Sequence, residues 1–162
     1  MAEKILRVLI ADDIASNRTI VGAFLAHLDC VPLFASDGVE AVDIFRRESP
    51  DVVLMDLMMP RMDGFEAIRQ IRAIAGDHWV PIIILSALTG EGDIVHGLDV
   101  GADDYLAKPL SFPVFSARFK ALRRLLDMRR RLVLMSAELH AANQRLNEMV
   151  EIDALTGLVN RR

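Results

Sequence analysis

The sequence has few of the features that mark secreted or membrane-spanning proteins. It has a single cysteine, Cys30, so no disulfide can form within the chain, and this usage suits a reducing compartment. The longest apolar run, residues 79–85, contains Pro81 and is far too short to cross a bilayer. Glu3 and Lys4 interrupt the first apolar residues, so we expect no signal peptide. These absences predict a cytoplasmic protein without a membrane partner.

Charge is unevenly spread along the chain. Residues 1–112 contain 9 lysines and arginines against 18 aspartates and glutamates, a net charge of −9. Residues 113–162 contain 10 against 5, a net charge of +5, so the total of −4 hides two different halves. The 52% hydrophobic share excludes a disordered chain, and 162 residues allow one domain with an appendage.

The acidic half alternates short apolar runs with segments of helix length. Runs without polar alternation are typical of strands that are buried on both faces of a parallel sheet. Five strands alternating with helices predict a doubly wound α/β domain, in which ligands bind at the carboxyl ends of the strands. The runs are residues 6–11, 31–35, 52–55, 81–85 and 105–107.

Turn and capping residues indicate where the helices between these runs begin. We expect Ser16 and Asn17 to cap a first helix whose apolar face contains Ile20, Phe24 and Leu28. Three further helices are expected to begin at Asp37-Gly38, at Asp63-Gly64 and near Glu91.

The basic half lacks helix breakers, because no glycine or proline occurs between Val114 and Thr156. One helix of about 40 residues, roughly 60 Å long, is therefore possible. Such a helix could pack its apolar stripe on its own domain, but it would overhang a domain about 30 Å across. A coiled-coil stalk that joins two copies of the chain is the better interpretation. The seam repeats at three- and four-residue spacing through Leu125, Met128, Leu132, Met135, Leu139, Ala142, Leu146 and Met149.

Polar side chains follow four of the five predicted strands. Asp12 and Asp13 end the first strand and Asp56 ends the third, so three carboxylates should converge at the carboxyl edge of the sheet. Such a cluster repels itself unless a cation lies among the oxygens, and hard oxygen ligands suit Mg²⁺. Ser86 and Lys108 end the fourth and fifth strands. This set of groups suits an oxygen-rich, dianionic ligand.

The sequence resembles a known family at these positions. Residues 10–13 (IADD), 55–64 (MDLMMPRMDG), 85–87 (LSA) and 105–109 (YLAKP) resemble, in order, the motifs of the receiver domain of two-component response regulators. The resemblance covers roughly residues 5–122 and places the receiver domain at 1–122. It implies a flavodoxin-like fold with strand order 2-1-3-4-5. It also implies a sensor histidine kinase as the partner.

The resemblance further implies a role for each acidic residue. Asp56 would accept a phosphoryl group from a phosphohistidine of the kinase. Asp13, Asp56 and the backbone carbonyl of Met58 would hold Mg²⁺, and Asp12 would act through water.

The remaining motif residues would respond to the phosphoryl group. Lys108 would pair with its oxygens, and Ser86 would move to hydrogen-bond one of them. Tyr105 would be the aromatic switch that turns inward behind Ser86. The peptide bond between Lys108 and Pro109 is expected to be cis.

Residues 152–162 do not belong to a receiver. They resemble the D-x-L-T-G-L-x-N-R-R segment that opens GGDEF domains, the diguanylate cyclases that make cyclic di-GMP from GTP. The resemblance implies a truncated GGDEF domain at 152–162, and the heptad seam then becomes a helical coiled-coil linker at 123–151. This chain would then be no enzyme itself but the phosphoacceptor part that regulates a diguanylate cyclase.

Two other functions fit parts of the sequence. The chain could be a stand-alone receiver that acts by docking a partner protein, although residues 152–162 argue against this. A basic cluster beside leucine heptads superficially resembles a DNA-binding zipper, but the arginines overlap the first two heptads, so we do not expect nucleic acid as a partner. The cluster consists of Arg123, Arg124, Arg129, Arg130 and Arg131.

Overall fold

The structure, a computed structural model, describes residues 3–156, with side chains described as far as Val150. Five parallel strands form one sheet in the order β2-β1-β3-β4-β5, which confirms the predicted flavodoxin-like fold. The elements are β1 (Leu6–Ala11), α1 (Ala15–Ala26), β2 (Cys30–Ala35), α2 (Gly38–Glu48), β3 (Val52–Met55), α3 (Gly64–Ala75), β4 (Ile82–Ser86), α4 (Glu91–Asp99), β5 (Asp104–Ala107) and α5 (Phe112–Thr156).

Strand register sets which residues meet at the carboxyl edge of the sheet. Ala11 of β1 lies beside Met55 of β3, so Asp12 and Asp56, which follow them, leave the sheet next to each other. β5 pairs in parallel with β4 and ends directly before Lys108, at the same edge. The register alone therefore gathers acidic and basic groups at one place.

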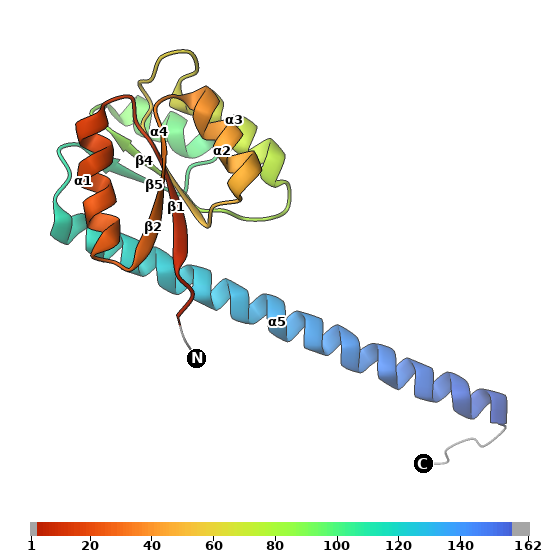
Figure 1. Cartoon of the computed structure of the whole chain (residues 1–162). Helices are drawn as coiled ribbons and strands as arrows, with labels where there is room; N and C mark the ends of the chain where they lie inside the picture. Colours follow the sequence, from red (N-terminus) through yellow and green to blue (C-terminus); the bar gives the residue numbers. More distant parts are fainter. Residues whose placement is uncertain (1–2, 157–162) are drawn as a thin grey trace. The chain divides into compact units, whose positions relative to one another are not determined.

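Helices cover both faces of this sheet. Figure 1 shows α2 and α3 on one face and α1 on the other. On the first face, Leu9, Val53 and Ile84 of the strands and Ile68 and Ile71 of α3 belong to one buried apolar cluster. This burial supplies the main driving force for folding the sheet between its helices.

The other face is closed by aromatic contacts between α1 and the first turn of α5. The ring of Phe24 lies 5.2 Å from that of Phe112 and 5.5 Å from that of Phe115, in tilted arrangements that aromatic pairs favour. Phe115 is fully buried. These contacts hold the segment that follows Lys108 against the sheet.

Two of the predicted helix starts are confirmed in detail. The carboxylate of Asp37 accepts a hydrogen bond from the Glu40 amide and caps α2. In the same way Asp63 accepts from the Glu66 amide and caps α3. The fourth helix, α4, begins at Glu91 as expected.

The expected start of α1 is wrong. The helix begins at Ala15, after Ile14, and no side chain caps it. The side-chain amide of Asn17 does not cap the helix but donates to the buried carboxylate of Asp12. The apolar face is also shifted, because Val21 is buried whereas Ile20 is 49% exposed.

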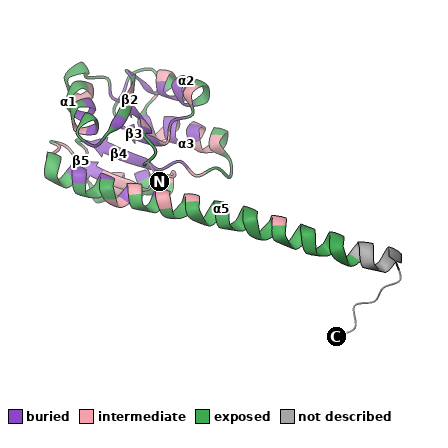
Figure 2. Cartoon of the chain, turned by 60° about the horizontal axis from the view of Figure 1, so that its bottom comes forward, coloured by how far each residue is buried: buried purple, intermediate pink, exposed green. Residues whose placement is uncertain are grey.

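Helix α5 is continuous over 45 residues, which confirms the predicted long helix, although it begins at Phe112 and contains Pro113 in its first turn. The chain divides into two compact units within this helix, the first ending at Arg118 and the second beginning at Phe119. Residues 131–140 are all exposed, and most of the outer part of α5 is green in Figure 2. Among the described residues, none of the helices is apolar enough over sufficient length to cross a membrane. Of the segment that resembles a GGDEF opening, residues 157–162 lie outside the described residues.

One glycine allows the chain to turn closely around the end of β3. The Gly64 amide donates to the carbonyl of Leu57 at 2.9 Å. A Cβ atom at Gly64 would lie only 2.1 Å from the backbone oxygen of Asp56. Because that neighbour is backbone, it cannot move aside without displacing Asp56 itself.

We expect Gly64→Ala to lower the free energy of unfolding by about 2 kcal/mol or more, because the added methyl group forces the backbone apart. Gly92→Ala is the matched control, since it lies in α4 and a Cβ there meets no atom within 4 Å. The control should be neutral or more stable by about 0.5–1 kcal/mol through helix propensity. Urea unfolding of both variants measures the difference, and equal effects would contradict the close approach at Gly64.

Candidate functional site

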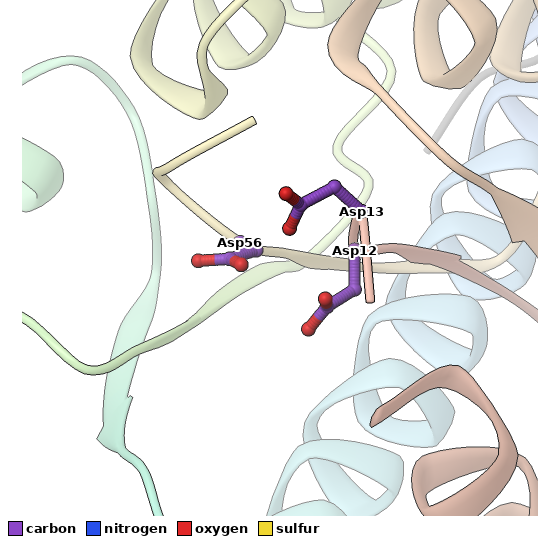
Figure 3. Close-up of side chains that lie close together, drawn as sticks. All are labelled: Asp12, Asp13 and Asp56. Atoms are coloured by element: carbon purple, nitrogen blue, oxygen red, sulfur yellow. The ribbon is translucent and has the colours of Figure 1, made fainter. Parts of the chain in front are cut away.

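Three carboxylates meet at the carboxyl edge of the sheet. Asp12 and Asp13 follow β1 and Asp56 follows β3, and one oxygen of each lies within 4.8 Å of the others. Figure 3 shows the three side chains gathered at this edge. Asp12 and Asp56 are buried, at 4% and 6% exposure, whereas Asp13 is exposed. The predicted convergence of these residues is therefore present.

Lys108 provides the positive charge among these acids. Its Nζ lies 2.6 Å from an oxygen of Asp12 and 3.2 Å from an oxygen of Asp56. The side chain is only 17% exposed, so the ion pairs lie in a weakly screened environment. The peptide bond to Pro109 is cis, as the family resemblance implied.

The ionisation of this group reflects its burial. Desolvation raises the pKa of Asp56, and the neighbouring charge of Asp12 raises it further, while Lys108 opposes both. For Lys108, burial lowers the pKa, but the hydrogen bond with Asp12 and the charges of both carboxylates more than compensate, so its pKa is raised. The charged form of Asp56 is therefore disfavoured, whereas the charged form of Lys108 is favoured.

The donor set fits a hard divalent cation. Carboxylate oxygens are the ligands that Mg²⁺ prefers, and the exposed Asp13 leaves room for the waters that Mg²⁺ retains. The backbone amide of Met58, two residues after Asp56, donates a hydrogen bond of 3.4 Å to the Asp56 carboxylate. A single lysine leaves two negative charges of the three uncompensated, which a divalent cation would balance.

Asn17 is a site residue that the sequence pattern predicts only as a helix cap. Its side-chain amide donates to both oxygens of Asp12, at 3.3 and 3.2 Å. The Ile14 amide donates to the same carboxylate at 2.9 Å. These bonds fix the orientation of a buried anion. The available signal in the sequence was the spacing of five residues between Asp12 and Asn17, which is ambiguous near a helix start.

Ser86 and Tyr105 converge on the backbone of Leu88. The Leu88 amide donates to the Ser86 hydroxyl at 3.2 Å, and the Tyr105 hydroxyl donates to the Leu88 carbonyl. Ser86 is buried at 1% exposure, and Tyr105 packs against the apolar core. Both side chains thus hold the same residue of the loop that leads into α4, Ser86 through the Leu88 amide and Tyr105 through the Leu88 carbonyl.

Residues 8–120 match the sequence profile described as the response regulator receiver domain. The chain belongs to this family. The chain is also similar to curated proteins over the same region. It is 45% identical over 118 residues to the "Probable transcriptional regulator ycf27" of Guillardia theta, covering 73% of this chain and 45% of that protein. It is 41% identical over 119 residues to the "Response regulator MprA" of Mycobacterium sp. (strain KMS), covering 74% and 51%. The chain thus spans about half the length of these relatives.

Solved receiver structures show the same fold. The receiver domain of the Francisella response regulator 1452 superimposes with a TM-score of 0.67 at 32% identity, covering 74% of this chain and 97% of that one. The Vibrio cholerae chemotaxis protein CheY4 gives 0.67 at 30% identity, covering 75% and 98%. A receiver is a regulatory phosphoacceptor domain that interacts with sensor histidine kinases, and receivers bind Mg²⁺ through an acidic cluster such as the one present here.

We expect Asp56→Asn to stabilise the receiver in magnesium-free buffer at neutral pH, by a few degrees in Tm or on the order of 1 kcal/mol. The raised pKa of Asp56 means that its ionisation destabilises the fold, while Lys108 keeps its bond to Asp12. As the pH falls through this raised pKa toward the ordinary value of 3.8, wild-type Asp56 becomes neutral and the difference should shrink. Thermal melts of both proteins across pH measure this, and a constant difference would contradict it.

Proposed function

We propose that Asp56 accepts a phosphoryl group from a phosphohistidine of a sensor histidine kinase. The observation that carries this proposal is the placement of the Asp56 carboxylate within an acidic cluster and 3.2 Å from the Lys108 ammonium. An Asp56 oxygen attacks phosphorus, the bond from phosphorus to the imidazole nitrogen breaks, and the imidazole leaves with the electron pair. The leaving nitrogen takes up a proton from water, or the other ring nitrogen already carries one, so the products are an aspartyl phosphate and a neutral histidine of the kinase.

The chain's own residues hold the reacting groups. Asp13, Asp56 and the Met58 carbonyl would hold Mg²⁺, with Asp12 acting through water. Mg²⁺, when bound, would neutralise charge on the transferring phosphoryl oxygens. Lys108 transfers its bond from the Asp56 carboxylate to a phosphoryl oxygen, while its 2.6 Å contact with Asp12 keeps the ammonium in place.

We propose that Ser86 and Tyr105 transmit phosphorylation through Leu88. The Ser86 hydroxyl now accepts from the Leu88 amide, and donating to a phosphoryl oxygen requires it to move toward Asp56. That movement breaks the bond at the Leu88 amide, while the bond from the Tyr105 hydroxyl to the Leu88 carbonyl remains. The consequence is a shift of the loop before α4, a local movement of the kind that conformational switches use.

The apolar seam of α5 supports a second copy of this chain as a partner. Leu132, Met135 and Leu139 are 64–65% exposed, and Leu125, Met128, Leu146 and Met149 are 53–63% exposed. An apolar stripe that recurs at heptad spacing is suited to a coiled coil. We therefore retain the linker at 123–151 and propose homodimerisation through this seam together with a surface of the receiver at 1–122.

We propose diguanylate cyclase control as the output, on the resemblance of residues 152–162 to a GGDEF opening. Two GTP-loaded cyclase domains must meet face to face, so the geometry of a dimeric helix is a direct means of controlling them. A stand-alone receiver that docks a partner protein remains the alternative if no output domain follows.

DNA control is the second candidate output. Relatives named as transcriptional regulators match the receiver part of this chain and extend to about twice its matched length. The cluster of arginines at 123–131 would supply positive charge for such a function. These names run against our expectation that nucleic acid is not a partner.

Phosphorylation is tested with acetyl phosphate and Mg²⁺, which replace the kinase. We expect wild type to gain one phosphoryl group by intact mass and Asp56→Asn to gain none, because the nucleophile is lost. Sedimentation should show a larger species with beryllofluoride and Mg²⁺ in wild type only. Phosphorylation that persists in Asp56→Asn would overturn the site, whereas a phosphorylated chain of unchanged size would overturn the dimer switch alone.

The output is tested by extending the chain with whatever coding sequence follows Arg162 in its gene. We expect the extended protein to convert GTP to cyclic di-GMP, with a rate that changes on phosphorylation. Salt-dependent retention of duplex DNA without cyclase activity would favour the transcriptional output and overturn the cyclase. A stop codon directly after Arg162 would leave the stand-alone receiver.

A further inference from the structure

The loop between β3 and α3, residues 57–63, is anchored at several points. Leu57 and Met59 are buried at 2% and 9% exposure, while Met58 between them is 64% exposed. The Leu57 carbonyl accepts from the Gly64 amide, which closes the loop upon itself. Met58 is therefore held at the surface by its two buried neighbours.

A second set of contacts ties the far end of this loop to α2. The Gly38 amide donates to the Met62 carbonyl at 3.2 Å. A Cβ at Gly38 would lie 2.4 Å from that carbonyl oxygen, so the start of α2 and the loop are in direct backbone contact. The loop position thus depends on how firmly α2 and residues 61–62 are joined.

Arg61 links the loop to α2 by bonding to the buried carboxylate of Asp37. Its Nε and one terminal nitrogen donate to the same oxygen of Asp37, at 2.8 and 2.5 Å. The other Asp37 oxygen accepts from the Glu40 amide at 2.9 Å and caps α2. Asp37 is 7% exposed in its side chain, whereas Arg61 is 61% exposed. The carboxylate is thereby shared between a helix start and the loop.

Arg61 holds this position against its own backbone preference. Its φ is +63°, in the left-handed region that non-glycine residues avoid at a cost of about 1 kcal/mol. Glycine would adopt this conformation without strain. The ion pair between Arg61 and Asp37 thus offsets the conformational strain of the Arg61 backbone. This indicates that the role of an arginine at this position is to form that ion pair.

We propose that Arg61 is a positioning residue for the phosphorylation site. Clamped to Asp37, it holds the 57–63 loop so that the backbone carbonyl of Met58 is preorganised to bind Mg²⁺ beside Asp56. A carbonyl ligand is carried by the backbone, so its affinity for a cation depends on the rigidity of the loop. This inference rests on the proposed function, because it assumes that Asp56 and Met58 bind Mg²⁺.

Two variants remove the ion pair while sparing the fold. Arg61→Gly removes the guanidinium and also relieves the positive φ, so its Tm should not fall. Asp37→Asn keeps an oxygen that can accept from the Glu40 amide, so the cap of α2 survives while the charge is lost. Arg69→Ala is the matched control, since Arg69 makes an exposed ion pair with Glu66 outside the loop.

We expect both variants to bind Mg²⁺ about two- to fivefold more weakly by calorimetry, the range of a partly exposed ion pair. The rate with acetyl phosphate should recover to the wild-type value at saturating Mg²⁺. Hydrogen exchange at the Gly38 amide should accelerate, because its bond to Met62 loosens. The double variant should be no worse than either single one, and Arg69→Ala should match wild type.

The outcomes separate this inference from the proposed function. Wild type that binds no Mg²⁺ and is not phosphorylated would overturn the proposed function itself. Wild type that does both, with Mg²⁺ affinity unchanged in Arg61→Gly and Asp37→Asn, would overturn the role of Arg61. A lower Tm with unchanged Mg²⁺ affinity would likewise assign Arg61 to stability alone.

Discussion

The pairing of β1 with β3 is the constraint on which the rest of the site depends. Ala11 lies beside Met55, and each of these residues is followed by an aspartate. The pairing of the strands therefore brings two buried carboxylates together. Such a pair is unfavourable unless positive charge compensates it. Lys108, which follows β5, supplies part of that charge, although β3 and β4 lie between β5 and β1 in the sheet. The sheet thus places negative charge that is only partly compensated at one edge.

This uncompensated negative charge makes the site suited to binding a cation. A buried Asp56 with a raised pKa is stabilised by whatever neutralises it, and both a divalent cation and Lys108 can do so. The arrangement that weakens the fold in the absence of a cation therefore favours binding of one. Ser86 and Tyr105 both bond to Leu88 in the loop before α4, which is the route by which we propose that a change at Asp56 reaches this helix.

Local patterns were sufficient to predict the sheet and most of the site. Strand runs and the polar residues after them depend on neighbours in sequence, which is why Asp12, Asp56 and Lys108 could be placed at one edge. The start of α1 could not be predicted, because Asn17 had two possible partners and only the folded chain puts Asp12 within its reach. The bond between Arg61 and Asp37 spans 24 residues and arises from packing of α2 on the loop, so no local pattern indicates it.

The seam of α5 bears on how a change at the receiver could reach an output. From residue 131 to residue 140 every side chain is exposed, although this stretch includes Leu132, Met135 and Leu139. Burying such side chains in a second copy would be favourable, but methionine at alternate core positions specifies register less sharply than branched residues do. In a parallel pair, Arg124 would also face Arg129 of the second copy, which weakens that end. If two copies pair along this seam as proposed, a weak and poorly specified seam would have alternative pairings of similar free energy, and the small differential binding that a single phosphoryl group provides would suffice to select between them.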